Sequence, residues 1–233
     1  MEERNGCVLL GGCLGKIVFI VVILLCLRSC VGWLGDKGKE GYQRPSAFQN
    51  TLGRYKNSSL DLRFDLPEDM SFVSTEKDRE WEELTGTYEE MVAQGESGYT
   101  LVNVYDLAAI DGLQNSLGDA GVDMGDTLPL SLETTEEQML SFMLSGIPQE
   151  FGGGGGWEST TLEEVSFAGK DYLSQTWRIG AETENGQTVV MYIRGYARRK
   201  DDLMIYVMVT AQGTTLDETE NTLQKIVSAY RKA

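Results

Sequence analysis

The chain has 233 residues and a formal net charge of −16, and it contains no histidine. Residues 1–57 hold eight basic and four acidic residues, whereas residues 58–233 hold 12 basic and 32 acidic residues. A domain this acidic repels nucleic-acid phosphates, which excludes DNA and RNA as partners. All four cysteines lie within the first 30 residues. The acidic part therefore has no disulfide framework, no thiol nucleophile and no zinc site of the usual kinds, and we predict neither a metal nor a cofactor.

An apolar segment near the N-terminus predicts a membrane anchor. Residues Ile17–Leu27 are uninterruptedly apolar, and the segment extends past Arg28, because an arginine near a helix end can reach the interface. Trp33 falls where an interfacial aromatic residue belongs. The expected order is a tail (1–15), a single transmembrane helix in the lipid bilayer (16–34), a linker (35–57) and a soluble domain (58–233).

Two other interpretations of the N-terminal segment stay open. A cleaved signal peptide also has a short apolar region behind a basic segment, although the small residues of a cleavage site are poorly matched here. The residues Leu27–Cys30 resemble a lipoprotein signal, in which Arg28 departs from the usual small or aliphatic residue. Lys37 and Lys39 after the span favour a cytoplasmic domain, whereas a short tail and a cysteine-free domain favour the outside. We predict a single-pass protein of the cell membrane with its soluble domain outside.

The first half of the domain predicts a hairpin and a helix. Residues Leu60–Leu66 alternate between apolar and polar, and Met70–Val73 follows after a turn at Pro67, which is typical of two short paired strands. Apolar residues at helical spacing predict an amphipathic helix over Glu76–Ala93 with its aromatic stripe in the core. Those residues are Trp81, Leu84, Tyr88, Met91 and Val92. Residues Tyr99–Leu107 predict the next strand.

The middle of the chain predicts an acidic loop, a helix and a flexible connector. Residues 111–129 form the loop, and cation binding there stays open although the calcium-loop spacing fails, because Gly121 takes the third position counted from Asp119. Apolar spacing over residues 134–147 predicts a helix that ends before a proline. Five glycines at 152–156 predict a flexible connector, since no helix or lysine follows as a phosphate-binding loop would require.

The closing part, from Thr161 to Tyr230, has the clearest pattern. Turn signals at Gly169, at Asn185-Gly186 and at Asp201-Asp202 separate strands and predict an antiparallel meander, which a final amphipathic helix follows. The strand Leu203–Ala211 is apolar on both faces, which is typical of a central strand. The predicted fold class is α+β, an antiparallel sheet with helices packed on it.

This order of elements resembles the PsbP-like fold. The resemblance is carried by the join FDLPEDMSFVS, the segment VSFAGKDYLSQTW with its Gly-Lys turn, and the closing helix ENTLQKIVSAYRK, and it covers about residues 58–232. It implies a scaffold or binding module rather than an enzyme, as in membrane-anchored bacterial proteins of this fold, and it supplies no site residues. The stretch 111–157 is longer and richer in glycine than the resemblance leads us to expect.

The function we expect is that of a membrane-anchored, non-enzymatic, extracytoplasmic binding or accessory domain, with a protein or an envelope polymer as partner. Four basic residues gather near one end of the long hairpin, where they are candidate contacts for an anionic partner or serve to blunt a sheet edge: Arg194, Arg198, Arg199 and Lys200. One alternative is a carboxylate-dependent envelope hydrolase, with Trp157, Tyr172 and Trp177 lining a sugar cleft. The other is a lipoprotein-type sensor of the envelope. We assign no catalytic residue.

Overall fold

The computed structural model describes residues 42, 53–73, 79–96, 98–121, 129–145, 157–182 and 188–231, all of which belong to the unit Gly41–Ala233. The predicted anchor, the glycine run at 152–156 and the Asn185-Gly186 turn lie outside the described residues. Within the described ranges, no helix is long and apolar enough to cross a membrane.

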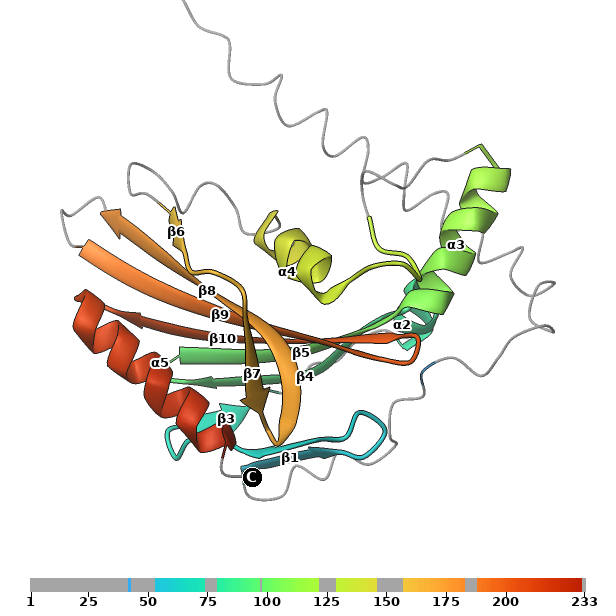
Figure 1. The fold of residues 1–233 in the computed structure, drawn as a ribbon. Coiled ribbons are helices and arrows are strands. Elements are labelled where there is room, and N and C mark those ends of the chain that lie inside the picture. Colours follow the sequence, from blue (N-terminus) through green and yellow to red (C-terminus); the bar gives the residue numbers. More distant parts are fainter. Residues whose placement is uncertain are drawn as a thin grey trace, which may run out of the picture. The chain divides into compact units, whose positions relative to one another are not determined.

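A large antiparallel sheet forms the centre of this unit (Figure 1). The spatial order of its strands is β3 (Met70–Phe72), β4 (Thr87–Gly95), β5 (Gly98–Asp106), β10 (Leu203–Gly213), β9 (Thr188–Lys200), β8 (Lys170–Glu182) and β6 (Trp157–Ser159). Strand β7 (Glu163–Phe167) also pairs with β8. The predicted α+β class and the C-terminal meander are confirmed, and β6 adds a short strand that the sequence did not indicate.

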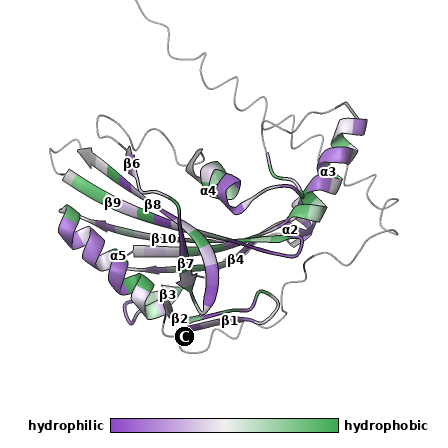
Figure 2. Cartoon of the chain, viewed as in Figure 1, coloured by the Kyte–Doolittle hydropathy of each residue, from purple (hydrophilic) through white to green (hydrophobic). Residues whose placement is uncertain are grey.

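Strand β10 lies between two hydrophobic cores, as its two apolar faces predicted. Ile205 and Val207 belong to the first core, whereas Met204 and Tyr206 belong to the second. The helix α5 (Leu216–Arg231) and a two-stranded sheet of β1 (Arg54–Asn57) and β2 (Leu62–Asp65) cover the first core. The helices α3 (Leu107–Asp119) and α4 (Glu136–Ser145) lie on the other side of the large sheet (Figure 1). Hydrophobic and hydrophilic residues alternate along α5 in Figure 2, as expected of a helix with one buried side.

Gly195 in β9 allows α4 to approach the sheet closely. A Cβ atom at this position would lie 2.8 Å from two ring atoms of Trp177 and 2.9 Å from a methyl carbon of Leu140. Both of these side chains are buried in the second core. The indole therefore lies over the glycine, in space that any side chain would occupy.

The predicted helix over Glu76–Ala93 is wrong beyond its first part. Helix α2 (Arg79–Thr85) ends at Gly86, which has a φ of 66°, and the chain continues as β4. The register with β5 shifts between Glu89 and Met91, which is a β-bulge. A bulge inserts an extra residue and breaks the two-residue alternation of a strand. The buried residues of β4 are therefore spaced along the sequence like those on one face of a helix.

The predicted loop over 111–129 is also wrong in its first part, because α3 extends to Asp119. Asp106, the last residue of the confirmed strand β5, accepts a hydrogen bond from the backbone N of Ala109 at 3.0 Å and caps this helix. Capping turns the chain directly from strand to helix, although the helix contains glycines that lower its propensity. The predicted helix over 134–147 is confirmed as α4 within the described residues.

The predicted N-terminal hairpin does not form between β2 and β3. Strand β2 pairs with β1, whereas β3 pairs with β4 in the large sheet. Residues 54–57, which the sequence placed in the linker, are β1 itself, and the domain begins before residue 58. Tyr55 and Asn57 have too few apolar neighbours in the sequence to reveal the strand, and they become buried only once it pairs with β2.

Candidate functional site

The structure distributes the four predicted basic residues over two faces of β9. Side chains alternate along a strand, so Arg194, Arg198 and Lys200 share one face and Arg199 lies on the other. The group that looks continuous in the sequence therefore serves different parts of the fold.

Arg194 is buried within the sheet, with 7% of its surface exposed. Its Nε donates to Ser174 Oγ at 3.1 Å, and its guanidinium forms an ion pair with Glu163 of β7. The guanidinium carbon also lies 5.5 Å from the ring centroid of Tyr196, which is the geometry of a cation–π contact. Arg194 thus joins three neighbouring strands and presents little charge to solvent.

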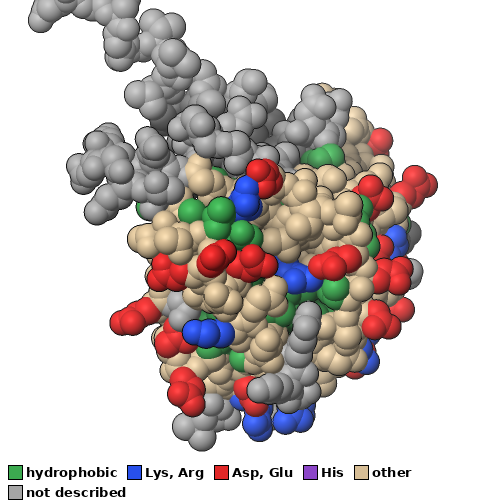
Figure 3. Space-filling view, turned by 60° about the vertical axis from the view of Figure 1, so that its left-hand side comes forward, with side chains coloured by type: hydrophobic (Ala, Val, Ile, Leu, Met, Phe, Trp, Pro, Cys, Tyr) green, Lys and Arg blue, Asp and Glu red, His purple; other side chains and the backbone are tan. Residues whose placement is uncertain are grey.

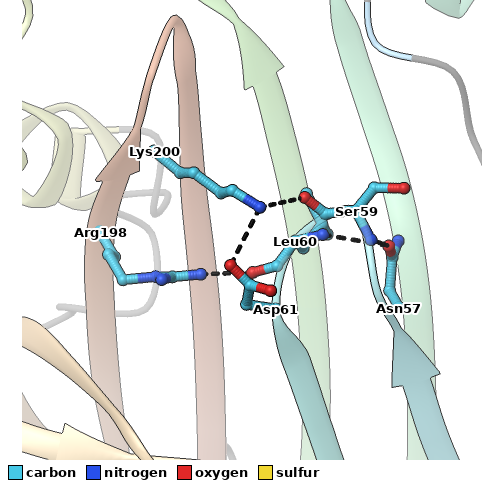
Figure 4. Close-up of polar contacts among 6 residues, drawn as sticks. All are labelled: Asn57, Ser59, Leu60, Asp61, Arg198 and Lys200. Atoms are coloured by element: carbon cyan, nitrogen blue, oxygen red, sulfur yellow. Dashed lines mark hydrogen bonds and ion pairs between the residues drawn. The ribbon is translucent and has the colours of Figure 1, made fainter.

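Arg198 and Lys200 hold the turn between β1 and β2 (Figure 4). Lys200 Nζ donates to the carbonyl O of Ser59 at 2.6 Å and lies 3.0 Å from Asp61 Oδ2. The guanidinium of Arg198 donates to the carbonyl O of Leu60. The hydrogen bond from Lys200 holds the pKa of Asp61 below its usual value. We call this arrangement of residues 58–61, Arg198 and Lys200 the hairpin latch.

Arg199 contacts the segment that leads into α4. Its Nε donates to the carbonyl O of Asp201 at 3.0 Å, and Nη1 donates to that of Thr134 at 3.4 Å. Its backbone N donates to Glu136 Oε1 at 3.1 Å in the first turn of α4. Each of the four predicted residues therefore has a partner within the domain.

A second polar centre, which the sequence did not indicate, surrounds Asn57 at the end of β1. The Asn57 side chain is 3% exposed, and its Nδ2 donates to Tyr42 Oη at 2.8 Å and to Glu90 Oε2 at 3.1 Å. Its Oδ1 accepts from the backbone N of Ser59 at 3.0 Å and of Leu60 at 3.3 Å. One amide side chain thus connects the linker residue Tyr42, strand β4 and the hairpin latch. We call Asn57 with Tyr42, Glu90 and Asp106 the Asn57 junction.

Tyr42 is fixed in the junction by three contacts. Besides accepting from Asn57, its backbone N donates to Asp106 Oδ2 at 2.9 Å. Its ring meets that of Tyr88 edge to face, with 5.0 Å between the centroids. A tyrosine that the sequence placed in the middle of a linker is therefore a buried part of the domain. A lone tyrosine among glycine and polar residues gave no signal of this role.

Buried carboxylates give the junction an acidic character. Glu82, Glu90 and Asp106 are all buried at this end of the sheet. Burial, with added repulsion from the nearby carboxylates, raises the pKa of Tyr88 to about 12. In the described parts of the chain, no three or more carboxylates are placed to hold a metal ion together. The sequence singled out none of these carboxylates, and it placed Asp106 inside the predicted strand Tyr99–Leu107.

Two of the three residues proposed to line a sugar cleft lie in the hydrophobic interior. Tyr172 belongs to the first core and Trp177 to the second, and both are buried. Glu163, an exposed carboxylate of β7, is the ion-pair partner of Arg194. The side chain of Trp157 lies outside the described part of the chain. What the two polar centres do together is to join the linker and the β1–β2 sheet to the large sheet.

Comparison with known proteins finds no matching family model and no similar curated protein. Among solved structures, the cyanobacterial PsbP protein of Synechocystis sp. PCC 6803 matches with a TM-score of 0.41 and 14% identity, over 82% of this chain and 98% of that chain. LpqN of Mycobacterium tuberculosis, described as involved in cell envelope biogenesis, matches with a TM-score of 0.35 and 11% identity, over 73% of this chain and 79% of that chain. A protein of unknown function from Pseudomonas aeruginosa matches with a TM-score of 0.28 and 11% identity, over 77% of this chain and 94% of that chain.

Proposed function

We propose that the chain is a membrane-anchored, non-enzymatic, extracytoplasmic accessory domain in which Tyr42 of the predicted linker is built into the fold. The observation that carries the proposal is the burial of Tyr42 in the Asn57 junction. A domain that moves freely on a flexible linker needs no such contact. A domain that works at a fixed distance from its membrane needs a contact that holds the linker against the fold.

The chain length between the predicted anchor and Tyr42 defines that distance. Tyr42 follows the predicted end of the span at Leu34 by eight residues. Eight residues in a fully extended chain reach at most about 30 Å. The Asn57 junction therefore stays within about 30 Å of the membrane surface, and the partner we propose is a protein or an envelope polymer close to that surface.

The polar side chains of both centres support an accessory role over an enzymatic one. Asn57, Arg198 and Lys200 form hydrogen bonds with the backbone and side chains of neighbouring segments. Asp106 caps α3 and binds the backbone of Tyr42. These groups position parts of the fold, which is the work expected of a scaffold.

Labelling of single cysteines in intact cells tests the proposed location. In a full-length chain whose four cysteines are replaced by serine, Gln224→Cys places a thiol on the exposed side of α5. We expect a membrane-impermeant maleimide to label it without permeabilisation, whereas Val227→Cys, buried on the same helix, stays unlabelled until the protein is denatured. Labelling of position 224 only after permeabilisation would place the domain inside and refute this part of the proposal.

Extraction of the membrane fraction tests the anchor. We expect the full-length chain to stay in the membrane after an alkaline wash, since a spanning helix is held by its buried apolar surface. The variant Cys30→Ser separates a spanning anchor from a lipid-modified one. Release of this variant, but not of the parent chain, would favour the lipoprotein alternative, and release of the parent chain would refute membrane anchoring.

A further inference from the structure

The outward side of the β1–β2 sheet is basic. Arg54 and Lys56 on β1 and Arg63 on β2 are exposed, while the residues that alternate with them are buried in the first core or the Asn57 junction. This side of the sheet faces away from the large sheet, and it therefore presents its charge to the surroundings.

Two of these residues form a pair of like charges. Lys56 lies directly opposite Arg63 in the antiparallel register of β1 and β2. Like charges that face each other across two strands destabilise the pairing. Arg54 has an ion pair with Asp65 at 2.6 Å, but neither Lys56 nor Arg63 belongs to an ion pair in the part of the chain that the structure describes. An anionic surface would relieve the repulsion between these two side chains.

Lys170 and Lys200 extend this charge around the turn, where both lower the pKa of Asp61. We define the basic face as five residues, which are Arg54, Lys56, Arg63, Lys170 and Lys200. With Asp61 and Asp65 among them, the face carries a net charge of +3, while residues 58–233 as a whole carry 12 basic and 32 acidic residues. Figure 3 shows acidic side chains spread over the surface and basic ones at several places on it, among them a group at its lower edge, the level at which Figure 1 places the β1–β2 sheet.

We propose that the basic face docks onto the anionic lipid headgroups of the membrane that holds the chain, an inference that rests on the anchor proposed above. Asn57 lies at the end of β1 and binds Tyr42, so the same chain length that limits the distance of the junction also limits that of the basic face. The positive charge of the basic face and its connection to the linker both favour anionic lipid headgroups as the partner of this face.

The acidity of the remaining surface makes the docking orientation specific. An anionic bilayer repels acidic side chains within about one Debye length of 8–10 Å. It attracts basic residues near the surface, each of which shifts the ratio of docked to undocked molecules by about fivefold. An anionic bilayer therefore attracts the basic face and repels the acidic parts of the described surface.

Energy transfer between the domain and the bilayer tests the proposal. The full-length chain with its four cysteines replaced by serine receives a donor fluorophore at Ser58→Cys, an exposed position in the β1–β2 turn. It is reconstituted into vesicles of phosphatidylcholine, with or without phosphatidylglycerol, that contain an acceptor-labelled lipid. We expect phosphatidylglycerol to increase the transfer, and high salt to abolish the increase.

Two double variants with the same change of charge show whether the basic face is responsible. Lys56→Gln with Arg63→Gln removes two charges from the face and should lower the ratio of docked to undocked molecules by about 25-fold. Arg178→Gln with Lys225→Gln removes two charges elsewhere and should leave the transfer unchanged. A melting temperature measured for both variants verifies that each remains folded.

The outcomes separate the docking from the anchor. Flotation of the vesicles reports whether the chain is held in the bilayer at all. If the chain floats, the inference is overturned when transfer is the same with and without phosphatidylglycerol, or when the two double variants lose equal transfer. If the chain does not float, the anchor fails, and the docking that rests on it fails with it.

Discussion

Replacement of Asn57 by alanine should destabilise the domain strongly, because this one side chain joins three segments of the fold. The side chain is buried and takes part in four hydrogen bonds, two as donor and two as acceptor. The bond to the buried Glu90 side chain is lost with the amide, and removing the partner of a buried polar group costs about 1–3 kcal/mol. The acceptor for two backbone N–H groups of the turn resembles a helix cap, which contributes about 1 kcal/mol.

These contributions are not additive, and we expect a total loss of about 3–5 kcal/mol, compared with about 5–15 kcal/mol for the stability of a whole domain. With a urea dependence of about 2 kcal/mol per M, the unfolding midpoint should fall by about 2 M. The measurement is urea unfolding of the full-length chain in detergent, followed by the fluorescence of its four tryptophans, of which Trp177 is buried.

Asn115→Ala on the exposed side of α3 is the matched control, because the Asn115 side chain donates only one exposed hydrogen bond. It should change the free energy of unfolding by no more than about 0.5 kcal/mol. Asn57→Asp keeps the acceptor for the turn but replaces the amide donor with a second carboxyl group beside Glu90. The destabilisation by this variant should become smaller as the pH is lowered and the introduced carboxyl group is protonated. A loss below about 1 kcal/mol for Asn57→Ala would refute the view that this residue joins the linker, β4 and the turn.

Three further changes test other parts of the fold. Gly195→Ala should lower the free energy of unfolding in urea by about 1–3 kcal/mol, because the added methyl group meets the indole above it. Gly180→Ala, with nothing within 4 Å of the added methyl group, should be neutral or stabilising. Equal effects of the two variants would contradict this packing. Arg194→Met should lower the melting temperature more than Glu163→Gln, because the arginine is buried and the glutamate is half exposed, and the opposite order would contradict the assigned role. The pKa of Tyr88 is raised to about 12, so the folded state favours the protonated phenol. The stability that results is complete below pH 10 and is lost as the pH rises toward 12. Tyr88→Phe should therefore make the stability of the domain depend less on pH over this range, as followed by circular dichroism.

The closing meander was predictable because the apolar pattern of each strand and the turn residues between strands are local features of the sequence. Each strand from Val165 to Ala211 alternates or is apolar throughout, and turn residues separate the strands. The burial of both faces of β10 could be predicted from the sequence alone, since side-chain direction alternates strictly in an unbroken strand. Local periodicity is sufficient wherever the register has no interruption.

Strand β4 was not predictable for the same physical reason. The bulge between Glu89 and Met91 is defined by the partner strand β5, and it changes which side chains point into the core. Gly86, which ends α2, is equally compatible with a helix interior at the level of the sequence. Its positive φ and its close approach to Asp106 exist only in the folded chain.

The two polar centres show where the sequence and the tertiary structure divide. The sequence shows that the domain is acidic and lacks cysteine and histidine, and it predicts that a meander and a helix close the domain. It also revealed the basic residues of β9, because they differ from their acidic surroundings. The folded chain was needed to show that Arg198 and Lys200 bind a turn far away in the sequence, that Tyr42 belongs to the domain, and that Lys56 faces Arg63. Composition and periodicity are properties of a local window, whereas a hydrogen bond or a register joins residues whose separation in the sequence carries no trace of the contact.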